Sequence, residues 1–257
     1  MTSRIGVIVP TLNCATTLNW TLTALMSQKD CTVRIIAVDS GSTDGTLDIF
    51  SHWGVQVVYE PPGNMYRAIN KGIRLIDTEW CTYLNGDDIV FQDSYARLMK
   101  HGDAKRADIV YGLCDFIDFE GRFLYPFEAI PVAMLAGFLR SGVMGFAQPA
   151  AIFRAPVYRE LDGFDEKYRM MADLDFFARA ILAGKRFMRL PGSSVAAFRL
   201  YDNQLSTRES GNMVREKELF MQRWGRRKRV VGWLALQAWR ILNIRNYVIR
   251  FLRNSLR

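Results

Sequence analysis

Two acidic loops, each directly after a strand-like apolar run, hold the residues best suited to chemistry. Asp39 opens the first loop after residues 34–38, and Asp87 and Asp88 end the second after residues 80–84. In an open α/β sheet, ligands bind outside the carboxyl ends of the strands. Asp39 could accept hydrogen bonds from a base or ribose, while Asp87 and Asp88 are hard oxygen ligands for Mg²⁺ or Mn²⁺ on a polyphosphate. The pair of loops therefore points to a nucleotide-activated substrate.

Each loop also has a purely structural interpretation. The first could be a strand-to-helix turn with solvated carboxylates, in which Thr43 or Asp44 caps the next helix. Adjacent carboxylates such as Asp87 and Asp88 are common in surface turns, although the preceding apolar strand favours a metal site. A third acidic segment, residues 162–175, could simply place Asp173 at a helix N-terminus, where a carboxylate contributes ~0.3–1 kcal/mol.

The elements that position these loops alternate between strand and helix over the first hundred residues. Short apolar runs predict strands, and apolar residues spaced three or four apart predict helices. Strands are expected at residues 5–9, 33–38, 55–59 and 80–84, and helices at 16–27, 46–53, 66–76 and from 94 onward. Beyond these, strands are expected at 108–119, 122–125, 150–154, 187–190 and 195–200, with helices at 132–139 and 174–183. This alternation predicts an α/β fold with right-handed βαβ units and a mostly parallel sheet flanked by helices.

The charge is divided unevenly along the chain. The net charge is +8, from 34 Lys and Arg against 26 Asp and Glu. Ten of the basic residues and none of the acidic ones lie between Arg223 and Arg257, so the rest carries 24 basic and 26 acidic groups. This pattern disfavours nucleic-acid binding by the whole protein. It indicates that a partner attracted by positive charge would bind the C-terminal segment.

Cysteine usage and the N-terminal residues suggest a reducing compartment. Cys14, Cys31, Cys81 and Cys114 are scattered, without the close pairs of a zinc site. The first residues lead straight into a strand, without the charged and apolar regions of a signal peptide. We therefore expect four free thiols and a cytoplasmic location.

Taken together, the motifs resemble glycosyltransferase family 2. The resemblance covers about residues 4–207, and its motifs occur in the family's order: Val7–Asn13, Val38–Thr46, Leu84–Asp88, Gly163–Glu166 and Ala172–Asp175. It implies the GT-A fold and an inverting mechanism. The processive members carry a Gln-x-x-Arg-Trp motif, and Gln222-Arg223-Trp224 has the wrong spacing, which favours a single sugar addition.

The resemblance also implies a role for individual residues. Asp173 matches the catalytic base, which would take a proton from an acceptor hydroxyl. Asp87 matches the second acid of the Asp-x-Asp metal motif, with Asp88 beside it, and the cofactor would be Mg²⁺ or Mn²⁺. The nucleotide of a nucleoside-diphosphate sugar would contact five residues: Pro10, Thr11, Asp39, Arg67 and Asn70. The acceptor would be a saccharide or a lipid-linked sugar, in the assembly of a cell-surface polysaccharide or glycolipid.

Three positions depart from the family pattern. Asn85 replaces the first acid of the metal motif, Tyr201 stands where a His is common, and Ala147 replaces a His before Gln148. Asn85 would bind a cation more weakly than a carboxylate, and Asp202 could support the site.

Two other function classes stay open at this point. A nucleotide-sugar-binding protein that has lost catalysis would explain Asn85 and Tyr201 as marks of a decayed metal site. A sugar-phosphate nucleotidyltransferase would need a glycine-rich basic loop after the first strand, and residues 10–13 lack it.

The sequence predicts a GT-A catalytic domain and a basic helical tail. The domain spans residues 1–207, with a nucleotide-binding half at about 1–100 and an acceptor half at about 101–207; the tail is 208–257. The tail is amphipathic, and its basic cluster at 226–229 would add ~1 kcal/mol per charge near an anionic membrane. We expect residues 226–257 to bind the cytoplasmic face of a membrane; the alternative is packing on the catalytic domain or on a second subunit.

Overall fold

The computed structural model describes residues 3–202, 204, 210–224, 229–244 and 248–249. Its first part alternates between strand and helix, as predicted, in the order β1 (Ser3–Thr11), α1 (Ala15–Met26), β2 (Cys31–Asp39), α2 (Thr46–His52), β3 (Gln56–Tyr59), α3 (Met65–Ile73) and β4 (Trp80–Tyr83). Along β1, Ile8 packs into one apolar cluster and Val7 and Val9 into another. Because side chains alternate along a strand, β1 is buried on both faces of the sheet.

The central seven-stranded sheet has the order β10-β6-β9-β4-β1-β2-β3. β1 pairs in parallel with β2 and β4, and Thr11 lies beside Asp39 in the register. The exception is β9 (Ala151–Arg154), which runs antiparallel between β4 and β6 (Ile109–Tyr111). β10 (Phe187–Arg189) completes the edge in parallel with β6. The prediction of a mostly parallel sheet is therefore confirmed.

A smaller four-stranded sheet carries the segment after the second acidic loop. Its order is β5 (Ile89–Val90), β11 (Ala196–Arg199), β7 (Cys114–Ile117) and β8 (Phe123–Phe127). The single strand predicted at 108–119 is wrong, because the chain leaves the large sheet at Gly112 and enters the small one. A Cβ at Gly112 would lie 2.9 Å from a methyl carbon of Val195, so the crossing depends on the missing side chain.

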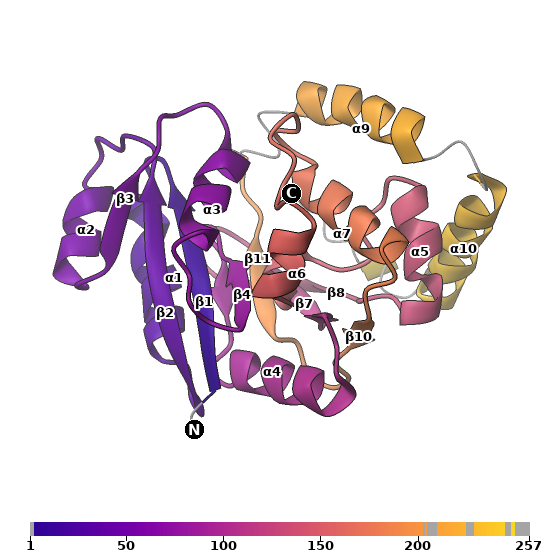
Figure 1. Ribbon diagram of the computed structural model, residues 1–257, viewed down its shortest axis with the longest axis horizontal. Helices are drawn as coiled ribbons and strands as arrows, with labels where there is room; N and C mark the ends of the chain where they lie inside the picture. Colours follow the sequence, from indigo (N-terminus) through magenta and orange to yellow (C-terminus); the bar gives the residue numbers. More distant parts are fainter. Residues whose placement is uncertain (1–2, 203, 205–209, 225–228, 245–247, 250–257) are drawn as a thin grey trace.

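Helices cover both faces of the large sheet (Figure 1). Beyond α3 they are α4 (Ser94–Lys105), α5 (Val132–Arg140), the 3₁₀ turn η1 (Gln148–Ala150), α6 (Ala155–Glu160), α7 (Ala172–Leu182), α9 (Ser210–Trp224) and α10 (Arg229–Leu242). α7 begins two residues before the predicted helix, so it places Asp173 in its first turn.

The described part of the predicted tail packs on the domain before it. Figure 1 shows α9 lying across the end of α7 and α10 beside α5. Phe220 of α9 is fully buried in the apolar cluster that includes residues of α7. The ring of Trp239 of α10 packs edge to face on that of Phe138 of α5, with the ring centroids 6.5 Å apart. The domain boundary at residue 207 stays a prediction, and in the basic cluster residues 226–228 lie outside the described residues.

The described helices include none with the length and apolar character that a membrane crossing requires. Residues 245–247 and 250–257 of the predicted membrane-binding segment also lie outside the described residues.

The approach of α3 to the sheet yields a stability prediction. A Cβ at Gly72 would lie 2.8 Å from Ile8 and 3.0 Å from Val38 side-chain atoms. We expect Gly72→Ala to lower the free energy of unfolding by ~1–3 kcal/mol, because overpacking shifts the surrounding side chains. Denaturant unfolding measures the change. Gly211→Ala is the control, since no described atom lies within 4 Å of a Cβ there; equal losses in both variants would contradict this explanation.

Candidate functional site

The Asp39 carboxylate, at the end of β2, is buried and bonded to its own loop. The Thr11 hydroxyl donates to Oδ2 at 2.9 Å, and the Ser42 hydroxyl donates to the same oxygen at 2.5 Å. The backbone N–H groups of Gly41 and Ser42 donate to Oδ1 at 2.9 and 2.8 Å. Pro10 and Thr11 are also buried. Asp39 thus fixes the backbone of the predicted nucleoside loop against the end of β1, and its contact with a nucleoside stays a prediction.

The same loop is tied to the helix that follows β1. Asp44 accepts hydrogen bonds from the N–H of Thr46 at 3.1 Å and from the N–H of Ala15 at 3.0 Å. Because Ala15 and Thr46 are the first residues of α1 and α2, one carboxylate caps both helices. The capping role considered for Asp44 is confirmed, and it holds the loop from two sides.

Both the nitrogen and the oxygen of the Asn70 side-chain amide, on α3, form hydrogen bonds with the segment before α7. Its Nδ2 donates to the Phe164 carbonyl at 2.9 Å and to Glu166 Oε1 at 2.8 Å. Its Oδ1 accepts from the Phe164 N–H at 3.0 Å and from the Tyr158 hydroxyl. Asn70 therefore fastens residues 162–166 to α3, a role that its sequence motif did not predict; its contact with a nucleotide stays a prediction.

Arg67 and Lys71 form a paired basic group beside the end of β3. Arg67 Nε lies 2.6 Å and Lys71 Nζ 3.1 Å from the two carboxylate oxygens of Glu60. Burial raises the pKa of Glu60, but hydrogen bonds from Lys71 and Arg67 outweigh it and leave the pKa below its ordinary value. The Arg67 and Lys71 side chains remain 39% and 36% exposed, so both cations also face solvent.

The second acidic loop carries two consecutive carboxylates, of which Asp88 is buried and Asp87 is half-buried. Asp88 is fully buried; its Oδ1 accepts the Arg199 N–H at 3.0 Å and its Oδ2 accepts Asn85 Nδ2 at 3.2 Å. Asp87 Oδ2 accepts the Tyr201 hydroxyl at 2.9 Å. Burial raises the pKa of both carboxyls, and the charge of Asp87 raises that of Asp88 further. The loop is thus held by β11 and the residues that follow it.

Arg199 of β11 is a fully buried guanidinium that sequence reasoning missed. Its Nε donates to the Asp87 carbonyl at 2.8 Å and its Nη1 to the Phe119 carbonyl at 2.5 Å. The guanidinium carbon lies 4.6 Å from the centre of the Trp20 ring, within reach of a cation–π contact. The one available signal was a charged residue inside the apolar run 195–200.

The oxygen donors of this loop fit a hard divalent cation. Asn85 Oδ1 is buried and has no hydrogen-bond partner among the described residues. Asp87, Asp88 and Asn85 offer carboxylate and amide oxygens, the donors that Mg²⁺ binds beside water and phosphate oxygens. The described residues include no group of three or more His, Cys, Asp or Glu side chains placed to hold a metal ion. Asp202 is exposed next to Tyr201, and its support of the site stays a prediction.

Asp173 lies in the first turn of α7 beside two tyrosines that the sequence did not single out. Its Oδ1 accepts the Tyr66 hydroxyl at 3.1 Å and the Leu174 N–H at 2.7 Å. Burial raises the pKa of Asp173 to about 6. Burial also raises the pKa of Tyr83 well above its usual value, with further contributions from the neighbouring Tyr66, Asp173 and Asp88. Through Tyr66, whose ring lies 6.4 Å from that of Tyr83 between centroids, the predicted base is linked to β4, the strand before the predicted metal loop.

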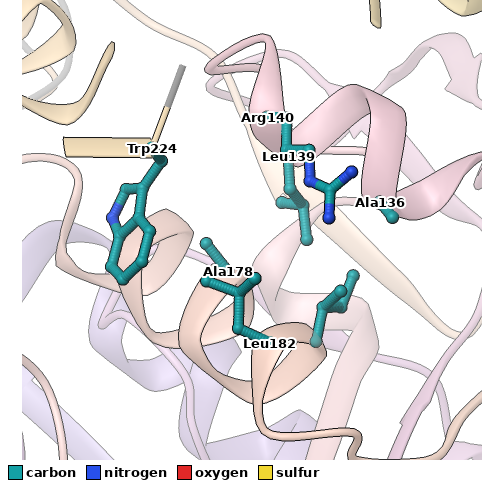
Figure 2. Close-up of a pocket in the computed structure, with 7 residues that line it drawn as sticks. Ala136, Leu139, Arg140, Ala178, Leu182 and Trp224 are labelled. Atoms are coloured by element: carbon teal, nitrogen blue, oxygen red, sulfur yellow. The ribbon is translucent and has the colours of Figure 1, made fainter. Parts of the chain in front are cut away.

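A pocket elsewhere on the molecule is separate from these residues. Figure 2 shows Trp224 of α9 facing Leu139 and Arg140 of α5, with Ala178 and Leu182 of α7 between them. The residues that line it include none of those predicted for the site. It belongs to the packing between the last helices and α7.

The contact between Tyr66 and Asp173 gives a prediction for titration. A hydrogen bond to an ionised carboxylate is worth ~1.5 kcal/mol or more, so Tyr66→Phe should raise the pKa of Asp173 by about one pH unit. Carbon-13 NMR of the Asp173 carboxyl measures it. Tyr95→Phe is the control, because the buried Tyr95 hydroxyl has no partner among the described residues. An unchanged pKa in Tyr66→Phe would contradict the contact.

Solved structures share this fold at low sequence identity. Staphylococcus aureus TarS 1–349 in complex with UDP superposes with a TM-score of 0.63 at 16% identity, over 88% of this chain and 71% of that one. The mannosyltransferase PcManGT of Pyrobaculum calidifontis, in complex with GDP-Man and Mn²⁺, also gives 0.63, at 18% identity over 93% and 75%. These likenesses confirm the GT-A fold.

Relatives in sequence are glycosyltransferases and a polysaccharide biosynthesis protein. A PGL/p-HBAD biosynthesis glycosyltransferase of Mycobacterium tuberculosis is 29% identical over 182 residues, 68% of each chain. The succinoglycan biosynthesis protein ExoO of Rhizobium meliloti is 26% identical over 202 residues, 70% of this chain and 56% of its own. The family model described as glycosyl transferase family 2 matches residues 6–162, more than half of the chain. The chain therefore belongs to glycosyltransferase family 2.

Proposed function

We propose that the protein is an inverting glycosyltransferase that moves a sugar from a nucleoside-diphosphate sugar to an acceptor hydroxyl. The observation that carries this proposal is the Asp173 carboxylate, half-buried in the first turn of α7, held by Tyr66 and with a pKa raised to about 6. A general base works best with a pKa near the operating pH, and it commonly contributes ~10²–10⁴-fold to the rate. Asp173 is thus suited to accept a proton at neutral pH.

The reaction would be a single displacement. The Asp173 carboxylate takes the proton of the acceptor hydroxyl, whose oxygen forms a bond to the anomeric carbon. The bond from that carbon to the diphosphate oxygen breaks on the opposite face, and the configuration inverts. Tyr66 holds one Asp173 oxygen at 3.1 Å and so fixes the direction of the other.

A divalent cation at the second acidic loop would stabilise the charge of the leaving diphosphate. Asp87 would hold it, with Asp88 and the unpartnered Asn85 Oδ1 as further oxygen donors. Pro10, Thr11 and Asp39 would face the nucleoside at the ends of β1 and β2. Arg67 would lie toward the diphosphate or sugar, where its exposed guanidinium supports the contact.

The acceptor would be a saccharide or a lipid-linked sugar. Two relatives are named for the biosynthesis of PGL/p-HBAD and of succinoglycan, which supports a role in glycoconjugate or polysaccharide assembly. The bound UDP-GlcNAc and GDP-Man of the structural neighbours support a nucleoside-diphosphate sugar as donor.

A nucleotide-sugar-binding protein without catalysis is the second candidate. It is favoured by the Tyr201 hydroxyl, which occupies an oxygen of Asp87, and by the neutral Asn85 in the metal motif. It differs from the transferase in predicting donor binding that is indifferent to divalent ions, and no turnover.

Two variants separate these candidates. We expect Asp173→Asn to reduce transfer ~10²–10⁴-fold with donor binding retained, and Asp87→Asn to abolish magnesium-dependent donor binding. Because Asp173 must be ionised, wild-type transfer should fall as the pH drops through about 6. UDP-GlcNAc and GDP-mannose serve as donors with octyl glycosides as acceptors, and saturation-transfer NMR with Mg²⁺ or EDTA measures binding.

The control is Asp48→Asn, which changes an exposed carboxylate of α2. Full transfer activity in Asp173→Asn would show that Asp173 is not the base. Donor binding that EDTA leaves unchanged, without turnover in the wild type, would favour the binding protein.

We also propose that α10 attaches the protein to an anionic membrane surface. Its Leu236 and Trp239 pack toward α5, but Trp233, Leu234 and Ile241 are 57, 53 and 71% exposed. Since a helix turns about 100° per residue, Leu234 and Ile241 lie together on the side opposite Leu236 and Trp239, and Trp233 lies between the two sides. An exposed apolar face in a segment with ten basic and no acidic residues suits an anionic lipid surface.

Vesicle binding tests this attachment. We expect co-sedimentation with phosphatidylglycerol-containing vesicles and not with pure phosphatidylcholine, and about tenfold or more weaker binding by Trp233→Ser/Ile241→Ser, since each buried side chain contributes ~1.5–3 kcal/mol. Val214→Ser/Leu219→Ser changes exposed apolar residues of α9 and should leave binding unchanged. A wild-type dimer in light scattering that the α10 variant dissociates would instead assign this face to a second copy.

A further inference from the structure

Glu216 of α9 receives three consecutive backbone hydrogen bonds from the loop that leads into α7. The N–H of Arg169 donates at 2.7 Å, that of Met170 at 2.9 Å and that of Met171 at 3.1 Å. Glu216 is only 7% exposed. A buried carboxylate with three N–H donors is held in one place, and it holds those three residues in turn.

This contact sits at the entrance of the helix that carries Asp173. α7 begins at Ala172, directly after the three residues that Glu216 binds. The N–H groups at a helix start have no partner within the helix, and negative charge is favourable there. Glu216 thus determines where the first turn of α7 lies, and with it the position of Asp173.

Three further contacts attach α9 to the acidic segment before α7 and to the first turn of α7. Arg223 Nη1 lies 3.2 Å from Asp165 Oδ2 and 3.3 Å from Asp175 Oδ1. Trp224 Nε1 donates to Asp175 Oδ1 at 3.0 Å. Asp175 is fully buried, so its carboxylate depends on these donors and on Arg179 at 2.7 Å. α9 therefore contacts α7 and its entry segment on both sides of Asp173.

Titratable groups on three elements surround or influence Asp173: Tyr66 of α3 donates a hydrogen bond to it, Glu216 of α9 raises its pKa through its charge, and Tyr83 of β4 lies beside Tyr66. Burial is the largest cause of the raised pKa of Asp173, and the Glu216 charge raises it further. Tyr66 acts in the opposite direction through its hydrogen bond. Removing the Glu216 charge should consequently lower the pKa of Asp173.

We propose that Glu216 is a positioning residue, which acts from α9 by holding the loop at residues 169–171 so that the Asp173 carboxylate keeps its direction. The inference rests on the proposed function, in which Asp173 is the base. Glu216 lies outside residues 6–162, the part that the family model matches.

The test compares Glu216→Gln with Glu218→Gln in the full chain. A glutamine has one acceptor oxygen, so at least one of the three N–H groups loses its partner. Glu218 is an exposed residue of the same helix and provides the control. Hydrogen exchange of the amides at 169–171 and carbon-13 titration of the Asp173 carboxyl are measured in wild type and both variants.

In Glu216→Gln we expect exchange at residues 169–171 to accelerate by ~10-fold or more, through local opening of the loop, and the Asp173 titration to move below about 6. Transfer should fall in kcat by ~10–100-fold with the donor KM unchanged, as for a displaced catalytic group. Glu218→Gln should match wild type in all three. If Glu216→Gln does not fold, Glu216→Asp is used instead, because it keeps the charge on a side chain that is one methylene shorter. Hydrogen exchange at residues 169–171 is then the deciding measurement.

Unchanged exchange and unchanged Asp173 titration in the Glu216 variant would overturn the inference. That result is distinguishable from failure of the proposed function, which Asp173→Asn tests separately. If Asp173→Asn is inactive in transfer and the Glu216 variant behaves like wild type, only the positioning role of Glu216 is ruled out. If Asp173→Asn is active in transfer, Asp173 is ruled out as the base.

Discussion

One carboxylate taken fully out of water, Asp88, next to the half-buried carboxylate of Asp87, is the constraint around which this structure is arranged. Asp88 is fully buried beside Asp87, and each is stable there only with donors already in place. Arg199 supplies one to the Asp88 carboxylate through its backbone N–H, and its buried guanidinium donates to the Asp87 backbone carbonyl and so holds the loop. The pairing of β5 with β11 in the small sheet meets this requirement, because β11 carries Arg199 and β5 follows directly on the acidic loop.

Helix α3 connects the two halves of the molecule. Asn64 at its start donates to the carbonyls of Glu166 and Tyr168, Tyr66 reaches Asp173, and Asn70 binds the Phe164 backbone. These contacts cross from the predicted nucleotide-binding half to the segment that carries the predicted base. A single helix of the first half therefore sets the distance between the end of the sheet and α7.

Local patterns of the sequence were enough for the fold and for the loops of the candidate site. The apolar run at residues 5–9 indicated a buried strand, and the apolar runs before the two acidic loops placed Asp39 and Asp87 at the same edge of the sheet. Partners distant in sequence were not readable: Arg199 and Asp88 are 111 residues apart, and Glu216 and Arg169 are 47 apart. Nothing in the local spacing of Asn70 distinguished a residue that faces a ligand from one that binds a neighbouring loop. Strand β9 shows the same limit, because its run of apolar residues carries no information about direction.

The attachment of α9 to α7 also bears on how much of the chain acts as one unit. The family match ends at residue 162, before Asp173, and the family motifs end before α9. A shortened protein that kept every motif but stopped before residue 210 would lose the Glu216 carboxylate and the Phe220 side chain, and would leave the Asp175 carboxylate without two of its donors. The family match thus leaves out these contacts, and a protein that keeps them all extends through Trp224.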